Sequence, residues 1–571
     1  MAQQIHYEIF RRRGASGSWT LVEARDRRED ALKFAESLIS GDTIAIKVVK
    51  ETYTEETGDY LSLTVFEHGD NKKKSKAASD DPPPLPCFRP DDLYSYHARK
   101  TIASLIPDFL ARHKVTVTEL GHRPDLIERL EATGTLLQHA IQRVAVAQAA
   151  SGENQLAKII RGLHDLTTQT MHRVYRDAEK KRFVAVAPGG FLAHAEKLAT
   201  AVDGQYLLNG SIAHYLKDTK GWDEKVVRLM LLMDEAVGET PGAKLLFTCI
   251  DNLISEVLGG SAGLRELIGA KETNGVAVMA LVRLYLGLEP EETEGREGLI
   301  ALTRQFKTDK LGNARIAIAQ RILAEIKSFK RLCPDSIENE LKSLRQIANL
   351  VVTGIGKYLS HEDLISAFVL RSQRLITAEA LAPYLSGVTP DVKLERILFV
   401  EENIIGVENK RRLADYVTPV ITGSNFESHF QGPTVPPLQR LQQLCTLQSR
   451  VQRSGFQEKQ RSEICEILDK VAANVEAKAR LFDSIERRSG SHIDKAVMLL
   501  RLVNANAFTA PRLAGRARQM IMGYLGQPGF LTGYIGQTAQ NGDHAAAMAG
   551  LMENLAKAGI SQEVGLKAIA A

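Results

Sequence analysis

The sequence predicts a mainly α-helical protein that begins with a small α+β module. Up to about residue 67, apolar residues alternate along short segments, which is typical of β-strands, and one amphipathic stretch interrupts them. From residue 91 onward, apolar residues recur every three or four positions in segment after segment, with little strand alternation. We therefore expect a ββαββ module followed by a large all-helical body of stacked helical hairpins, either an irregular solenoid or chained bundles.

The N-terminal module, residues 1–67, contains four alternating segments that predict strands. The turns between them contain Gly14 and Gly17, and later Gly58. The strands are expected near residues 6–11, 19–23, 44–49 and 61–65. One helix laid across this sheet leaves its other face partly open, and an open face or a free edge of a small sheet often serves as a docking surface. The alternative is a small domain that is simply fused to the body.

The helix of this module lies between the second and third strands. Asp26 is suited to cap its start, and Gly41 follows as a stop signal. Its apolar stripe is expected to cover the sheet and consists of Ala31, Leu32, Ala35, Leu38 and Ile39.

Residues 68–90 are predicted to be a linker. Four lysines between residues 72 and 76 give way to Asp80, Asp81 and the run Pro-Pro-Pro-Leu-Pro at 82–86. Such a stretch cannot bury apolar area, and its prolines favour an extended chain. A semi-stiff spacer is the simpler interpretation; recognition of the proline run by a partner's aromatic groove is the alternative.

The helical body is predicted to have three parts: a long-helix bundle at 91–185, a helical-hairpin body at 186–431 and a C-terminal helical region at 432–571. Two long amphipathic helices are expected near 124–150 and 153–181. Glycine-rich turns then recur at intervals of one helix plus a loop: Gly189-Gly190, Asp203-Gly204, Gly221, Gly238 to Gly242 and Gly259-Gly260. No repeated consensus of a named helical-repeat family is present.

A heptad-like seam marks the C-terminal region. The segment 457–488 is expected to be one helix, started by a capping box at Ser454-Gly455-Phe456-Gln457 and preceded by a helix over 437–453. Between Val475 and Phe482, the seam position is occupied by Lys478, whose charge interrupts the apolar series. The seam can pack inside a bundle, or it can pair in a homodimer. Its residues are Ile464, Leu468, Val471, Val475, Phe482 and Ile485.

Composition excludes several classes of protein. No run of about 18 apolar residues exists, so we expect no membrane span, and the first residues lack a signal-peptide core. The formal net charge of +4 is spread along the chain without a basic block, which argues against nucleic acid as a partner. The five cysteines form no pairs of metal-ligand spacing, as in a cytoplasmic protein with reduced thiols.

Enzyme motifs occur only in unsuitable contexts. Gly259-Gly260-Ser261-Ala262-Gly263 fits the nucleophile-elbow pattern, but a helix precedes it where a strand is required. Glu119 and His122 have the spacing of a metal-ligand pair on a helix, although a glycine lies between them. We expect no cofactor and no metal, and the sequence argues against an enzyme.

One histidine has a more specific interpretation. The segment around His214, His-Tyr-Leu-Lys, resembles the region of the phosphorylated histidine in phosphotransfer domains. The resemblance implies that His214 accepts a phosphoryl group and that Lys217 stabilises its charge. Asp218 stands where that family usually has glycine, and its charge opposes a phosphoryl group.

These observations predict a non-catalytic cytoplasmic helical scaffold or adaptor that binds protein partners, within a signalling pathway in one version of the hypothesis. The alternative is a phosphorelay or sensory component that uses His214. A helical enzyme whose site forms only in three dimensions is a weaker third option.

Overall fold

A computed structural model of the chain describes most of the sequence. The chain forms two compact units, Met1–Arg371 (unit 1) and Ser372–Ala571 (unit 2). The described residues are 5–13, 19–39, 43–54, 59–69, 87–150, 156–291, 294–308, 310–432, 435–538 and 543–570. The predicted turns at Gly14, Gly17 and Gly58, the predicted helix stop at Gly41 and most of the predicted linker at 68–90 lie outside these residues. The predicted three-part division of the helical body stays a prediction.

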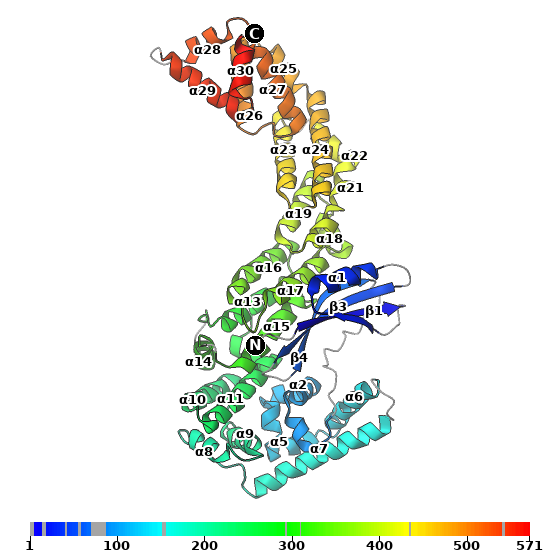
Figure 1. Ribbon diagram of the computed structural model, residues 1–571, viewed down its shortest axis with the longest axis vertical. Helices are drawn as coiled ribbons and strands as arrows, with labels where there is room; N and C mark the ends of the chain where they lie inside the picture. Colours follow the sequence, from blue (N-terminus) through cyan, green and yellow to red (C-terminus); the bar gives the residue numbers. More distant parts are fainter. Residues whose placement is uncertain are drawn as a thin grey trace. The chain divides into compact units, whose positions relative to one another are not determined.

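The N-terminal module has the predicted ββαββ order. Its elements are β1 (Ile5–Arg13), β2 (Thr20–Arg25), α1 (Arg28–Ser37), β3 (Thr43–Thr54) and β4 (Asp59–Gly69). The four strands form one antiparallel sheet in the order β2-β1-β3-β4, so β2 and β4 are the edge strands. The helix α1 lies across one face of this sheet (Figure 1).

The alternation of the strands determines which face α1 covers. Successive side chains of a strand point to opposite faces, so Tyr7 and Ile9 share one face of β1. These two residues pack with Ile46 and Val48 of β3, Val65 of β4 and the small residues Ala31 and Ala35 of α1. The helix begins after Arg27, whose side chain forms no cap hydrogen bond. The expectation that Asp26 caps it is therefore wrong.

Unit 1 continues as a series of helices (Figure 1). The helices are η1 (Pro90–Tyr94), α2 (Tyr96–Leu105), α3 (Pro107–His113), α4 (Val117–Leu120), α5 (Pro124–Glu131), α6 (Leu136–Ala150), α7 (Leu156–Glu179), α8 (Phe191–Leu198), α9 (Gly204–Tyr215), α10 (Trp222–Glu235), α11 (Pro241–Gly259), α12 (Ser261–Ile268), α13 (Asn274–Tyr285), α14 (Glu297–Phe306), α15 (Gly312–Lys327), α16 (Ile337–Val351), η2 (Val352–Gly354) and the first part of α17 (His361–Leu375).

The glycine-rich turns predicted from the sequence separate helices in the structure. α8 follows Gly190, α10 follows Gly221 and α12 follows Gly260. The single helix expected over 124–150 is wrong, because α5 ends at Glu131 and α6 starts at Leu136. Gly134 lies between them with φ of +70°, a left-handed conformation that an α-helix cannot contain.

Carboxylates of one helix repeatedly cap the N-terminus of another. Asp223 of α10 accepts hydrogen bonds from the backbone N–H of Gly298 (3.0 Å) and Leu299 (3.2 Å) in the first turn of α14. Asp251 of α11 accepts in the same way from Ala314 of α15, at 2.9 Å. The first N–H groups of a helix have no partner within it, and the helix dipole favours a negative charge there. These contacts fix the register between neighbouring helices.

Unit 2 is helical throughout its described part (Figure 1). Its helices are α18 (Ala378–Leu385), α19 (Pro390–Asn403), α20 (Val407–Ala414), α21 (Val417–Thr422), α22 (Ser424–Gln431), α23 (Pro437–Arg453), α24 (Glu458–Ala479), α25 (Leu481–Arg487), α26 (His492–Asn504), α27 (Pro511–Leu525), α28 (Phe530–Thr538), α29 (His544–Lys557) and α30 (Gln562–Ala570).

The expected capping box at the start of α24 is wrong. The residue before α24, Gln457, forms no side-chain cap hydrogen bond. The hydroxyl of Ser454 instead donates to the carbonyl of Val451 at 2.6 Å, at the end of α23. The hydroxyl is therefore used to close the preceding helix.

Among the residues that the structure describes, no single helix combines the length and the apolar composition that crossing a membrane requires.

Candidate functional site

The face of the sheet opposite α1 carries a cluster of aromatic, aliphatic and basic side chains. Phe10 of β1 is paired in register with Leu21 of β2 and with Lys47 of β3, so the three side chains share one face. This is the face away from Ile9 and its core. We call the cluster of Phe10, Arg12, Trp19, Leu21 and Lys47 the open face.

Cations lie over the aromatic rings of the open face. The Lys47 ammonium is 4.9 Å from the centre of the Phe10 ring and 5.1 Å from that of Trp19. The Arg12 guanidinium lies 5.1 Å from the Trp19 ring. Each such contact is worth about 0.5–2 kcal/mol, depending on how far the cation is desolvated. Partial burial lowers the pKa of Lys47, against the opposing effect of Glu67.

The open face adjoins the outer edge of β2, which pairs with no further strand among the residues that the structure describes. β2 is an edge strand, and Leu21 on it is 50% exposed although it is a large apolar residue. A free edge presents unpaired N–H and C=O groups to which another strand can be added. The open face therefore offers both backbone hydrogen bonds and an apolar surface.

The module contacts the helical part of unit 1 through its other face. Tyr7 and Lys50 are paired in register on the α1 side of the sheet. The Tyr7 hydroxyl donates to Glu362 of α17, and the buried Lys50 ammonium donates to Asp363 at 3.1 Å. Burial and the Glu362 carboxylate raise the pKa of Tyr7. This attachment uses the face of the sheet opposite the open face.

His214 is at the C-terminal end of α9 and is exposed, whereas Ile212 and Ala213 before it are buried. Lys217 is also exposed but lies beyond the end of α9, in the turn that follows. Its charge acts on Asp125, whose pKa it helps to lower, although Arg123 contributes more. His214 therefore has the accessible imidazole that a phosphotransfer histidine requires. Lys217, which would stabilise the phosphoryl group, lies near the carboxylate of Asp125.

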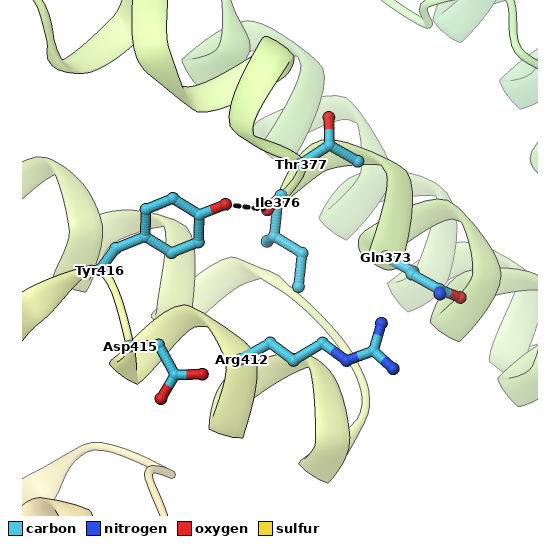
Figure 2. Close-up of a pocket in the computed structure, with 6 residues that line it drawn as sticks. All are labelled: Gln373, Ile376, Thr377, Arg412, Asp415 and Tyr416. Atoms are coloured by element: carbon cyan, nitrogen blue, oxygen red, sulfur yellow. Dashed lines mark hydrogen bonds between the residues drawn. The ribbon is translucent and has the colours of Figure 1, made fainter. Parts of the chain in front are cut away.

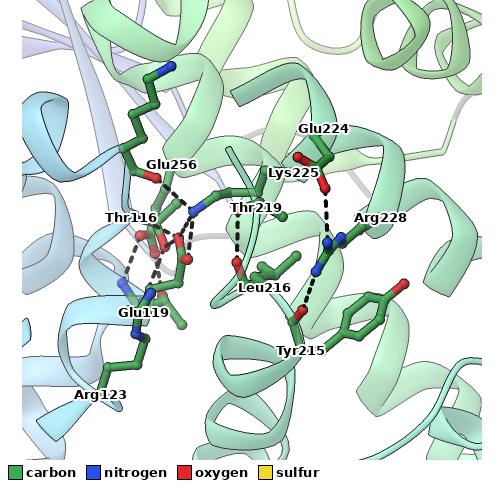
Figure 3. A network of polar contacts seen from close by, with 12 residues as sticks. Thr116, Glu119, Arg123, Tyr215, Leu216, Thr219, Glu224, Lys225, Arg228 and Glu256 are labelled. Atoms are coloured by element: carbon green, nitrogen blue, oxygen red, sulfur yellow. Dashed lines mark hydrogen bonds and ion pairs between the residues drawn. The ribbon is translucent and has the colours of Figure 1, made fainter. Parts of the chain in front are cut away.

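The turn after α9 lies near a buried network of polar contacts (Figure 3). The Lys225 ammonium of α10 is 2.6 Å from both carboxylate oxygens of Glu119 and donates to the carbonyl of Lys114 at 2.8 Å. Glu119 also accepts from the N–H and the hydroxyl of Thr116. Lys225 is 1% exposed and Glu119 0% exposed. Desolvation lowers the pKa of Lys225 against the attraction of Glu119.

A second ion pair, which is partly buried, lies beside the first. Arg99 of α2 donates to Glu256 of α11 at 2.7 Å, and Glu256 also accepts from the N–H of Thr118 at 2.9 Å. The two pairs join α2 and α4 to α10 and α11. Every charge in them has a close partner within the fold, so removal of one partner would leave the other charge without its counter-charge.

His122 forms the centre of a buried aromatic cluster with Tyr94, Phe183 and Tyr206, whose ring centres lie 4.8–5.8 Å from its own. Its Nδ1 donates to the carbonyl of Thr118 at 2.6 Å. Burial lowers the pKa of His122 to about 4. The imidazole is therefore neutral at physiological pH.

The Glu119–His122 spacing does not produce a metal site. Glu119 binds Lys225, and His122 binds the Thr118 carbonyl. No group of His, Cys, Asp or Glu suited to a metal ion occurs among the residues that the structure describes. Sequence reasoning missed both the ion pair and the aromatic cluster, because their members come from segments far apart in the chain.

The predicted seam is buried within unit 2. None of its six residues, Ile464, Leu468, Val471, Val475, Phe482 and Ile485, is more than 6% exposed. α24 packs against α23 and α27 of the same chain. The single helix expected over 457–488 is wrong, because Arg480 has φ of +51° and separates α24 from α25. A homodimer contact through this segment stays a prediction.

A surface hollow of unit 2, about 440 Å³ in volume, is lined by Gln373, Ile376, Thr377, Arg412, Asp415 and Tyr416 (Figure 2). Three of its polar groups have partners: the Tyr416 hydroxyl donates to the Ile376 carbonyl, Arg412 donates to Glu408, and Asp415 accepts from Gln460. This arrangement contains no nucleophile next to a base, which covalent catalysis requires.

No protein-family model, curated protein or solved structure matches the chain.

Proposed function

We propose that this chain is a cytoplasmic scaffold or adaptor that binds protein partners, and that the open face of its N-terminal sheet is a docking site. The observation that carries this proposal is the exposed Leu21 beside the half-buried rings of Phe10 and Trp19, on the edge strand β2 and its neighbour β1. Aromatic residues and arginine are enriched at the centres of protein interfaces, where they provide most of the binding energy.

Two further observations support the proposal. Lys50 and Tyr7 attach the sheet to α17 through its α1 side, opposite the proposed docking face. The cross-helix carboxylate caps and buried ion pairs favour a rigid helical body, which is what a scaffold needs to hold partners in place. The five cysteines are all free thiols, as expected of a cytoplasmic protein.

The docking site is tested by replacing Leu21 with aspartate in the full-length protein. Leu21 is 50% exposed, so the change leaves folding intact but places an unpaired charge in the apolar surface. We expect recovery of co-purifying proteins from an extract of the source cells, quantified by mass spectrometry, to fall at least tenfold for a defined partner set.

The matched control is Lys33→Asp, because Lys33 is exposed on α1, on the opposite side of the sheet. This variant should capture the partner set as wild type does. A Leu21→Asp protein that retains every partner would contradict the docking site.

A second candidate, a phosphorelay or sensory component, rests on the exposed imidazole of His214. Under this proposal, incubation with acetyl phosphate adds a phosphoryl group to His214, and mass spectrometry detects it. His214→Gln should abolish the modification, while His172→Gln, an exposed control on α7, should not. An unmodified His214 after prolonged incubation would exclude this candidate.

A further inference from the structure

A second cavity, in unit 1, lies among α12, α13, α14 and α16. Its volume is about 240 Å³, just below the roughly 300–1,000 Å³ typical of small-molecule sites. We call it the α13 pocket, because α13 contributes Val276, Met279, Ala280, Arg283 and Leu284. Its size suits a small ligand.

The inner wall of the α13 pocket is apolar and closely packed. Ile268, Leu284 and Leu299 line it and are at most 7% exposed. Two further apolar lining residues reach solvent: Val276 is 45% exposed and Leu288 38% exposed. An apolar ligand group in the pocket would shield these two side chains from water, which is favourable by about 25 cal/mol per Å² of apolar surface removed from water.

Among the described residues that line the pocket, Lys271, Arg283, Arg296 and Glu291 are charged, and Lys271 and Arg296 each already have an interaction partner. The Arg283 guanidinium donates to the carbonyl of Glu289 at 2.9 Å and lies 3.5 Å from Glu291. Its Nε–H is buried and has no hydrogen-bond partner. A buried donor without a partner is costly, and a bound anion would satisfy it.

From this combination we propose that the α13 pocket binds a small amphipathic carboxylate, with its apolar tail against Ile268 and Leu299 and its carboxylate at Arg283. Guanidinium groups form strong charge-assisted hydrogen bonds with carboxylates, and the unpartnered Nε–H of Arg283 favours an anion over a cation. The site is independent of the docking face on the sheet, which lies on different elements.

The test is calorimetric titration of the full-length protein with octanoate, alongside octylamine and octanol, which share the chain length but differ in charge. We expect octanoate to bind at least tenfold more tightly than either of the others. Octylamine that binds as tightly as octanoate, or octanoate that does not bind up to millimolar concentration, would overturn the proposal.

Two variants assign the binding to this pocket. Arg283→Gln should weaken octanoate binding at least tenfold, and Met279→Trp, which fills the cavity, should abolish it. Arg265→Gln is the matched control, since Arg265 is exposed on α12 outside the lining. Equal octanoate affinity for Arg283→Gln and wild type would overturn the proposal, and this arm remains decisive if the tryptophan variant fails to fold.

Discussion

Replacing Lys225 by methionine is expected to destabilise unit 1 by about 3–5 kcal/mol, because the change leaves the Glu119 carboxylate buried without its counter-charge. Glu119→Gln should have an effect of the same order, since it leaves the Lys225 ammonium buried beside a neutral partner. The measurement is hydrogen exchange of α4 and α10 in increasing urea, which reports local opening in a chain with more than one compact unit.

The matched control for this pair is Glu224→Gln on the same helix. Glu224 binds Arg228 at 2.9 Å, but its side chain is 40% exposed and the pair is solvated (Figure 3). Surface pairs contribute about 0–1 kcal/mol, so this variant should stay close to wild type. If the amide hydrogens of α4 and α10 exchange at the same rate in Glu119→Gln and in Glu224→Gln, the buried pair does not hold α4 to α10.

Acidification is expected to destabilise unit 1 through His122. The pKa of His122 is about 4 in the folded protein and about 6.5 in an unfolded chain, so the unfolded state binds more protons between these values. The contribution of His122 to the free energy of unfolding is therefore fully present above pH 6.5. It is lost as the pH drops from 6.5 to 4, and the loss for this group alone is about 3 kcal/mol. Urea titrations followed by hydrogen exchange at pH 7 and pH 4.5 measure this loss.

The contribution of His122 is separated from that of other groups by His122→Phe. Phenylalanine keeps a ring between Tyr94 and Tyr206 but takes up no proton. This variant should lose less stability than wild type between pH 7 and pH 4.5, whereas the exposed His172→Phe should follow wild type. Equal acid sensitivity of His122→Phe and wild type would show that another group controls the transition.

Much of the fold was predictable because its signals are local. The alternation of Tyr7 and Ile9 and the stripe that contains Ala31 and Ala35 are sequence patterns, and the structure confirms the ββαββ module and the helical body. The break at Gly134 was not predictable from periodicity, because the apolar pattern continues on both sides of it and a glycine inside a helical pattern is ambiguous.

The site was less predictable, because it depends on distant partners. Glu119 and Lys225 are 106 positions apart, and no local pattern indicates that they meet. The open face forms because the strand register places Phe10 beside both Leu21 and Lys47. The alternation of residues along each strand does not predict which residues of neighbouring strands are paired. The sequence indicates His122 only as half of a metal-ligand pair, whereas Tyr94 and Tyr206 surround it in the fold.

The most direct test of the account is photo-crosslinking from the open face. A photoreactive benzoyl-phenylalanine at position 21 of the full-length protein, irradiated in an extract of the source cells, should yield discrete protein adducts. The same group at position 33, on the exposed side of α1, should not yield those adducts. Adducts of equal yield at both positions, or none at position 21, would contradict the proposal that the sheet presents a docking face for a protein partner.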